Sequence, residues 1–228
     1  MSYTIYKEAK PQIKAILFDM DGVIIDSEKL YVRFWKEAAN KLGYNMTHEE
    51  ALGLRSSNRI DATNYLKKLY GNDVSYDAIR NLRIKLMDEF INTHGIEAKK
   101  GVKEILDYLD LNNIPRVIVT SSPIERVKAH LGYLNILNRF DKICTAYEVK
   151  RGKPHPDIYL YAAKCLNLDP NDCLAIEDSP SGINSAASAK ANAIIIPDQD
   201  EPTEDILNLC YGKADSLLDL INLIEKIK

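Results

Sequence analysis

Apolar residues near the N-terminus form a short continuous run, which is the pattern of a buried β-strand. Residues Ile13–Phe18 read Ile-Lys-Ala-Ile-Leu-Phe, and the run stops at Asp19. A short apolar run bounded by polar residues suits a strand that is covered on both faces. We therefore predict a buried strand here, preceded by a loose segment over residues 1–12.

The next section of the chain changes to helical periodicity. Between Ser27 and His94, apolar residues recur every three or four positions, as they do on one face of a helix. Three helices are indicated, and they would end at Gly43, Gly71 and Gly95. The section has no proline and almost no strand signal, which predicts an all-helical block.

Beyond Gly101 the pattern alternates between helices and short apolar strands. Helices are predicted over 102–111, 123–131, 157–166, 181–189 and 217–227, and strands over 117–119, near 143, over 173–176 and over 193–196. This alternation is typical of a parallel sheet covered by helices on both faces. The expected fold class is α/β. Residues 1–27 and 97–228 would form the sheet domain, and residues 28–96 an all-helical insertion.

Length and composition fit this plan and exclude other classes. The chain has 228 residues, of which 46% are hydrophobic and 28% charged, so it can bury a sizeable core. The 30 Lys and Arg against 33 Asp and Glu give a formal net charge of −3, and no basic excess indicates nucleic acid or a membrane surface. No apolar run reaches the ~18 residues of a membrane span.

The cysteines do not form the pattern of a metal or redox site. Cys144, Cys165, Cys173 and Cys210 include no Cys-x-x-Cys pair, so neither a zinc cage nor a thioredoxin-like site is expected. The N-terminal residues are too polar for a signal peptide. We expect a reduced, cytoplasmic protein, and a monomer.

Polar side chains gather where the predicted strands end. Because ligands of open α/β sheets bind at the carboxyl ends of the strands, we expect these side chains to converge. A cluster of acids is unfavourable unless a cation holds it together, and oxygen ligands alone select a hard cation, in the first place Mg²⁺. The converging residues would be Asp19, Asp21, Thr120, Ser121, Ser122, Glu177 and Asp178, together with Lys153 from a Gly-Lys-Pro turn.

This set suits phosphoryl transfer. Asp19 would attack phosphorus and become an aspartyl phosphate. Asp21 would protonate the leaving alkoxide and then deprotonate the incoming water. Mg²⁺ and Lys153 would neutralise the phosphate charge so that a carboxylate can approach it. The candidates for phosphate binding are Thr120, Ser121, Ser122 and Lys153.

Four motifs resemble those of the haloacid dehalogenase superfamily. They are Asp19-Met20-Asp21-Gly22-Val23, Thr120 after an apolar strand, Gly152-Lys153-Pro154-x-Pro156-Asp157, and Glu177-Asp178-Ser179-x-x-Gly182. Each motif alone is a weak pattern, but four in order are highly specific, and the resemblance spans roughly residues 13–225. It implies a Rossmann-like core, a Mg²⁺ requirement and an inserted helical cap that closes over the phosphate ester, as in the β-phosphoglucomutase-like branch.

The resemblance also implies a set of metal ligands. Asp19 and Asp178 would bind the metal through their side chains, and Asp21 through its backbone carbonyl. Glu177 would help directly or through water. Asp21 and the Glu177-Asp178 pair favour phosphate chemistry over dehalogenation.

Cap residues bear on the choice between a phosphatase and a mutase. Mutases of this branch have a histidine twelve residues after the nucleophile, where this chain has Tyr31. Their cap loop reads Gly-Val-Ser-Arg, where this chain has Gly53-Leu54-Arg55-Ser56. A mutase must hold two phosphates at once, whereas a phosphatase needs one phosphate site and must admit water.

We therefore expect a Mg²⁺-dependent phosphatase that acts on a small phosphorylated metabolite, in the first place a sugar phosphate. A β-phosphoglucomutase is the alternative, and a non-catalytic sensor of phosphorylated ligands is a third possibility. The cap residues expected to contact the substrate are Tyr31, Arg55 and Ser56, with Arg83 or Lys85 as further candidates.

Overall fold

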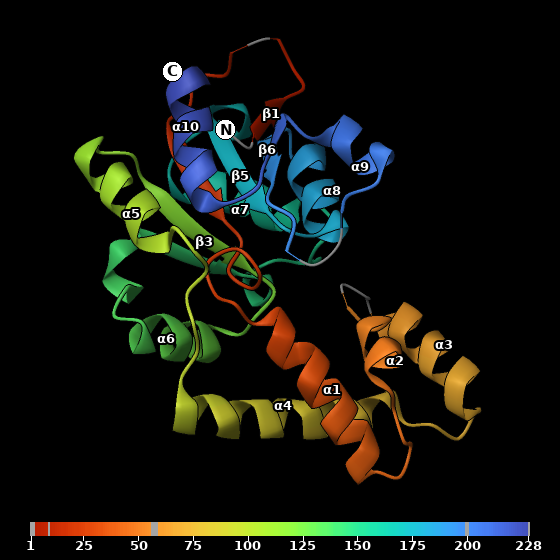
Figure 1. Cartoon of the computed structure of the whole chain (residues 1–228). Coiled ribbons are helices and arrows are strands. Elements are labelled where there is room, and N and C mark those ends of the chain that lie inside the picture. The colour runs from red at the N-terminus through yellow and green to blue at the C-terminus, as the bar shows by residue number, and fades with distance from the viewer. Residues whose placement is uncertain (1–2, 9, 56–58, 199–200, 228) are drawn as a thin grey trace. The chain divides into compact units, whose positions relative to one another are not determined.

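The structure, a computed structural model, describes residues 3–8, 10–55, 59–198 and 201–227. The chain forms two compact units, whose elements are labelled in Figure 1. Residues 1–25 and 97–228 make the first, here named the core unit, and residues 26–96 make the second, here named the helical unit. Of the predicted site residues, only Ser56 lies outside the described ranges.

A seven-stranded sheet organises the described part of the core unit (Figure 1). Its order is β1-β7-β6-β5-β2-β3-β4, and every neighbouring pair is parallel except β1 with β7. This mostly parallel sheet confirms the predicted α/β class. The strands are β1 Tyr3–Ile5, β2 Ala15–Phe18, β3 Arg116–Thr120, β4 Lys142–Thr145, β5 Cys173–Glu177, β6 Asn192–Ile195 and β7 Gly212–Ala214.

Strand β2 lies inside the sheet, between β5 and β3, and is buried along its whole length. One face of the sheet packs against helices α7 (Asp157–Cys165) and α8 (Pro180–Ser188). Because side chains alternate along a strand, Ile16 and Phe18 of β2 are buried on the opposite face. The further helices of the core unit are α5 Val102–Leu111, α6 Ile124–Tyr133, α9 Glu204–Leu209 and α10 Leu217–Ile227, with 3₁₀ turns at η1 Leu137–Arg139, η2 Ala146–Glu148 and η3 Pro170–Asp172.

The prediction of a loose segment over residues 1–12 is wrong for Tyr3–Ile5, which form the edge strand β1. Tyr3 pairs with Ala214 in the antiparallel register of β1 with β7, and the Tyr6 amide donates to the Tyr211 carbonyl at 2.9 Å. Three residues are too few to show a hydrophobic period. The partner strand lies at the other end of the sequence, so no local pattern indicates the pairing.

Helices alone build the described part of the helical unit. They are α1 Glu28–Lys41, α2 His48–Leu52, α3 Arg59–Tyr70 and α4 Tyr76–His94. Gly43, Gly71 and Gly95 follow α1, α3 and α4 with φ of 89°, 90° and 82°, positive values that glycine adopts more readily than other residues, so these predicted ends are confirmed. Helix α2 is absent from the sequence prediction because five residues show no period. A capping box between Thr47 and Glu50 fixes its start.

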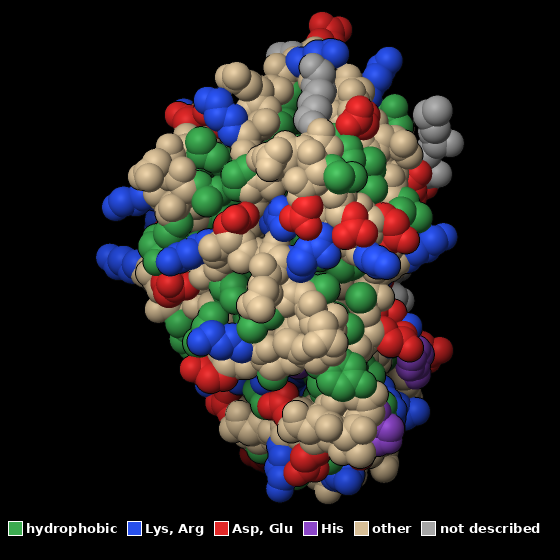
Figure 2. All heavy atoms as spheres, turned by 90° about the vertical axis from the view of Figure 1, so that its left-hand side faces the viewer, with side chains coloured by type: hydrophobic (Ala, Val, Ile, Leu, Met, Phe, Trp, Pro, Cys, Tyr) green, Lys and Arg blue, Asp and Glu red, His purple; other side chains and the backbone are tan. Residues whose placement is uncertain are grey.

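Two further observations concern the charge on the surface and the apolar character of the helices. Figure 2 shows one face of the molecule, on which acidic and basic side chains are interspersed rather than gathered by sign. Within the described part of the chain, no helix has both the length and the apolar character needed to span a membrane.

Candidate active site

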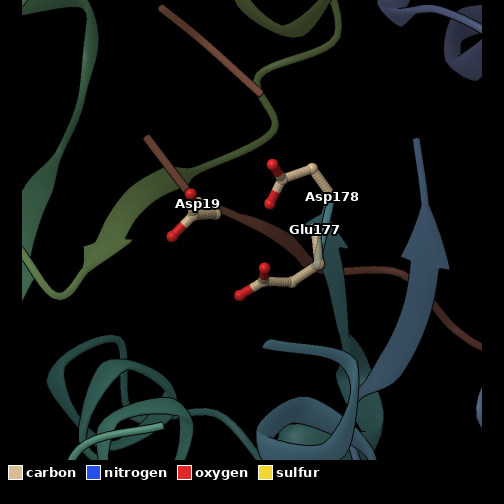
Figure 3. Close-up of side chains that lie close together, drawn as sticks. All are labelled: Asp19, Glu177 and Asp178. Atoms are coloured by element: carbon tan, nitrogen blue, oxygen red, sulfur yellow. The ribbon is translucent and has the colours of Figure 1, made fainter. Parts of the chain in front are cut away.

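Three carboxylates meet at the carboxyl ends of strands β2 and β5. In the register of these strands Phe18 lies beside Ile176, and the Asp19 amide donates to the Ile176 carbonyl at 2.9 Å. Glu177 ends β5 and Asp178 follows it, and both side chains extend toward Asp19 in Figure 3. Carboxylate oxygens of the three acids all lie within 4.8 Å of one another. The sheet register therefore brings together acids that are far apart in the sequence.

The burial of these acids makes their charge costly. The Asp19 side chain is 10% exposed and that of Glu177 is 0% exposed. Burial raises the pKa of Asp19 well above its usual value; attraction to Lys153 opposes the rise, while the charges of Glu177 and Asp21 add to it. An ionised cluster at this place needs positive charge beside it.

Lys153 supplies such a charge from the turn that precedes α7. Its Nζ lies 2.5 Å from Asp19 Oδ1 and 2.6 Å from Glu177 Oε1, and donates to the Val119 carbonyl at 3.0 Å. Burial alone would lower the pKa of Lys153, but the two carboxylates outweigh it and raise that pKa above its usual value. The lysine is therefore held in its charged form between two acids.

Asp21 has different neighbours. Its Oδ2 accepts a hydrogen bond of 3.0 Å from Ser122 Oγ, and the Ser122 amide donates to Thr120 Oγ1 at 3.0 Å. The group of mutually close carboxylates comprises Asp19, Glu177 and Asp178, without the side chain of Asp21. The two aspartates of the first motif thus face different environments, as an acid–base residue and a nucleophile require.

Gly22 allows the loop after β2 to pass close to Asp178. Its φ is +81°, and a Cβ placed on it would lie 2.1 Å from Asp178 Oδ2. Thr120 and Ser122 are buried, whereas Ser121 is exposed. Most of the predicted core-unit residues are thus buried or half-buried at the end of the sheet, whereas the side chain of Ser121 is exposed.

Sequence reasoning missed two residues that shape the site. Tyr159 of α7 is fully buried and donates its hydroxyl to Glu177 Oε1 at 2.5 Å. A Cβ on Gly182 of α8 would lie 1.8 Å from Glu177 Oε2. In the sequence Tyr159 has the spacing of an ordinary core residue, and Gly182 stands within a motif without showing what approaches it. Ser179 caps α8 by accepting from the Gly182 amide at 3.1 Å.

The predicted cap residues belong to the helical unit and are described within it. The Tyr31 ring lies 4.6 Å below the guanidinium of Arg83, which is buried. Arg55 is half-buried and donates its Nε to the Leu52 carbonyl at 3.2 Å. Lys85 is exposed. A role of these residues in substrate contact stays a prediction.

The donor set fits a hard divalent cation. Asp19, Glu177 and Asp178 offer only carboxylate oxygens, close enough to share one ion, and such ligands suit Mg²⁺ rather than a soft metal. Shared binding of a cation would also offset the repulsion among the three acids.

Comparison with known proteins places this geometry in a family. The family model described as "Haloacid dehalogenase-like hydrolase" matches residues 16–196. Hexitol phosphatase A of Escherichia coli K12 is 33% identical over 185 residues, which cover 80% of this chain and 82% of that protein. Hexitol phosphatase B of the same strain is 26% identical over 213 residues, covering 92% and 95%.

A solved structure agrees with these matches. The β-phosphoglucomutase of Clostridium difficile has a TM-score of 0.72 at 26% identity, covering 94% of this chain and 96% of its own. The match of the family model over most of the sequence, with its motifs at the strand ends described above, shows that the chain belongs to the haloacid dehalogenase-like hydrolases.

Proposed function

We propose that this chain is a Mg²⁺-dependent phosphatase that hydrolyses a small phosphorylated metabolite, with a sugar phosphate as the first candidate, through an aspartyl phosphate on Asp19. The observation that carries the proposal is the buried Asp19 carboxylate, held by Lys153 beside Glu177 and Asp178. The phosphatases among its relatives, two of them named for hexitols, support the class of substrate.

The metal would be held by the side chains of Asp19 and Asp178, the backbone carbonyl of Asp21, and Glu177 directly or through water. When bound, it supplies positive charge that offsets the negative charge of the phosphate. Lys153 adds a second positive charge beside the Asp19 carboxylate, through its contact with Oδ1. We assign the attack on phosphorus to the other oxygen, Oδ2.

The reaction has two steps at phosphorus. First, Asp19 Oδ2 forms a bond to phosphorus while the ester P–O bond breaks, and the leaving oxygen keeps the electron pair and takes a proton from Asp21. Then Asp21 takes a proton from water, and the water oxygen bonds to phosphorus as the bond to Oδ2 breaks. Inorganic phosphate leaves, and Asp19 and Asp21 return to their starting forms.

The residues after β3 would orient the acid–base group and the phosphate. Ser122 Oγ donates to Asp21, which fixes the carboxyl that moves the proton. Thr120 Oγ1 accepts from the Ser122 amide, which leaves its own hydrogen to donate to a phosphate oxygen. We propose that Thr120 and Lys153 bind the phosphate, with Ser121 and Ser122 beside them.

A metabolite panel tests the proposal. We expect release of inorganic phosphate from one or a few sugar phosphates in the presence of Mg²⁺, and loss of this release when EDTA removes the metal. A panel of sugar, polyol and nucleoside phosphates without phosphate release at any Mg²⁺ concentration would contradict the proposal.

A β-phosphoglucomutase is the second candidate, and the fold it shares with the Clostridium difficile enzyme favours it. An assay with β-glucose 1-phosphate and a trace of the bisphosphate distinguishes the two activities. Isomerisation without net phosphate release would identify a mutase, and net phosphate release a phosphatase.

A further inference from the structure

A tyrosine hydroxyl lies behind the proposed catalytic centre, on the side of the Glu177 carboxylate. Tyr159 is the third residue of α7, is 0% exposed, and donates to Glu177 Oε1 at 2.5 Å. A buried phenol needs a hydrogen-bond partner, and bonds to a carboxylate are short and strong. This contact links α7 to the end of β5.

The same carboxylate oxygen has a second donor. Lys153 Nζ lies 2.6 Å from Glu177 Oε1, and its own second partner, Asp19 Oδ1, lies at 2.5 Å. The lysine also lies over the ring of Tyr159, 5.5 Å from the ring centroid. A continuous chain of contacts therefore runs from the tyrosine hydroxyl through Glu177 and Lys153 to Asp19.

The remaining side of Glu177 is closed by the start of α8. Ser179 Oγ lies 3.5 Å from Glu177 Oε2, and Gly182 leaves the space that a Cβ would take from the carboxylate. Tyr159 and Lys153 contact Glu177 Oε1 and Ser179 contacts Oε2. Both oxygens of this carboxylate are therefore held in place.

We propose that Tyr159 is a positioning residue for the phosphoryl transfer and acts through Glu177 on Lys153. The inference rests on the proposed function of the site. A lysine is a point charge on a flexible stem, so its partners set where the charge lies. The hydroxyl of Tyr159 satisfies part of the Glu177 charge, which lets Lys153 divide its contacts between Glu177 and Asp19. Without the hydroxyl, Lys153 would move toward Glu177 and away from the nucleophile.

The test is Tyr159→Phe, which keeps the ring and removes only the hydroxyl. We expect kcat to fall by about 10- to 100-fold, with KM within about twofold of wild type because Tyr159 is fully buried beside Glu177. Isothermal titration calorimetry without substrate is expected to show weaker Mg²⁺ binding, since Glu177 belongs to the candidate ligand set. A lower kcat with unchanged Mg²⁺ affinity would place the effect on Lys153 and would still support the proposal.

Tyr161→Phe is the matched control. Tyr161 lies two residues further along α7, and its hydroxyl donates to Glu148 Oε1 at 3.1 Å, outside the candidate site. The control is expected to keep the kcat and Mg²⁺ affinity of the wild type. A Tyr159→Phe protein that loses thermal stability but keeps the kcat and Mg²⁺ affinity of wild type would overturn the proposal, because its role would then be structural only.

A double-mutant cycle with Glu177→Gln shows whether the effect passes through Glu177. We expect the double variant to lose less activity than the product of the two single losses. Activity losses that simply multiply in the double variant would show that Tyr159 does not act through Glu177 and would overturn the proposal. A wild-type protein that neither binds Mg²⁺ nor releases phosphate would refute the proposed function itself, whereas an active wild type matched by Tyr159→Phe would refute only the present inference.

Discussion

An ion cluster of the core unit and an ion pair of the helical unit have similar distances but very different burial. In the core unit the side chains of Lys153, Asp19 and Glu177 are 7%, 10% and 0% exposed, and Lys153 Nζ lies 2.5 Å from Asp19 Oδ1 and 2.6 Å from Glu177 Oε1. In the helical unit, Arg59 and Asp77 also approach to 2.5 Å, but their side chains are 71% and 53% exposed. An exposed pair contributes about 0–1 kcal/mol to stability, while buried charges carry a large desolvation cost. The geometry of a pair therefore says less about its role than its burial does.

In the described part of the helical unit, Arg83 is a buried cation that packs against aromatic rings. The Arg83 guanidinium lies 4.6 Å from the ring centroid of Tyr31 and 5.0 Å from that of Trp35. Aromatic faces attract a cation through the quadrupole of the ring. The core unit gathers the acids Asp19 and Glu177 around Lys153, an arrangement that phosphoryl transfer would use.

Asp19→Asn, in the buried cluster, should have the largest effect of the variants considered. We expect kcat for the best substrate to fall roughly 10⁴-fold or more, as when a covalent nucleophile is removed. The free energy of unfolding measured in urea with EDTA should not fall by more than about 1 kcal/mol, because the amide removes a charge that burial disfavours. Asp77→Asn, in the exposed pair, is the control and should keep full activity. Phosphatase activity that survives in Asp19→Asn would exclude this nucleophile.

Lys153→Met should have the next largest effect, in this case on stability. The change leaves Asp19 and Glu177 facing each other without their cation, and losing one partner of a buried pair costs about 3–5 kcal/mol. Urea unfolding at neutral pH measures the loss, which should shrink in acid because protonated carboxyls need no cation. Lys85→Met, at an exposed position, should change stability by less than about 0.5 kcal/mol. Equal losses of stability in Lys153→Met and Lys85→Met would contradict the distinction drawn between buried and exposed charges.

The sequence could place the main site residues because each follows a strong local signal. Asp19 and Glu177 come at the ends of apolar strands, and Lys153 lies in a Gly-Lys-Pro turn. In a parallel sheet, the carboxyl ends of the strands meet at one edge, so these signals suffice to bring the residues together. The helix ends at Gly43 and Gly71 were predictable for a similar reason, since a glycine stop is a local feature.

The rest depends on tertiary packing, which leaves no local signal. Tyr159 reads as one more apolar position of a helix, and only the fold shows that its hydroxyl meets Glu177. Strand β1 exists because β7 pairs with it, and α2 is too short for its period to be seen. No local sequence pattern specifies which residues of the helical unit contact a substrate, so the roles expected of Tyr31 and Arg55 stay predictions.

Gly182→Ala tests how firmly the site is packed. A new methyl group would overlap Glu177, which Lys153 and Tyr159 hold in place, so we expect a loss of about 1–3 kcal/mol in the free energy of unfolding together with a lower kcat. Gly132→Ala is the control, because a Cβ at this exposed position of α6 meets no atom within 4 Å, and alanine should stabilise the helix by up to about 1 kcal/mol. Similar effects in both variants would show that Glu177 moves aside freely.

The smallest expected effect concerns Glu50, a half-buried acid in the first turn of α2. Glu50 accepts from the Thr47 amide and from the Tyr70 hydroxyl, each at 2.8 Å, and these bonds, that of Thr47 first, hold its pKa below the usual value. Since the pKa of Glu50 is lower in the folded state, the stabilisation is present above the unfolded pKa and is lost as the pH falls through the folded pKa.

Glu50→Ala should therefore cost about 1 kcal/mol at pH 7, and the difference from wild type should disappear in acid. Fluorescence of Trp35, the chain's single tryptophan, follows unfolding of this unit. Glu49→Ala, in the same turn, should show a much smaller change, and a loss as large as that of Glu50→Ala would mean that the negative charge itself, rather than the two hydrogen bonds, stabilises α2.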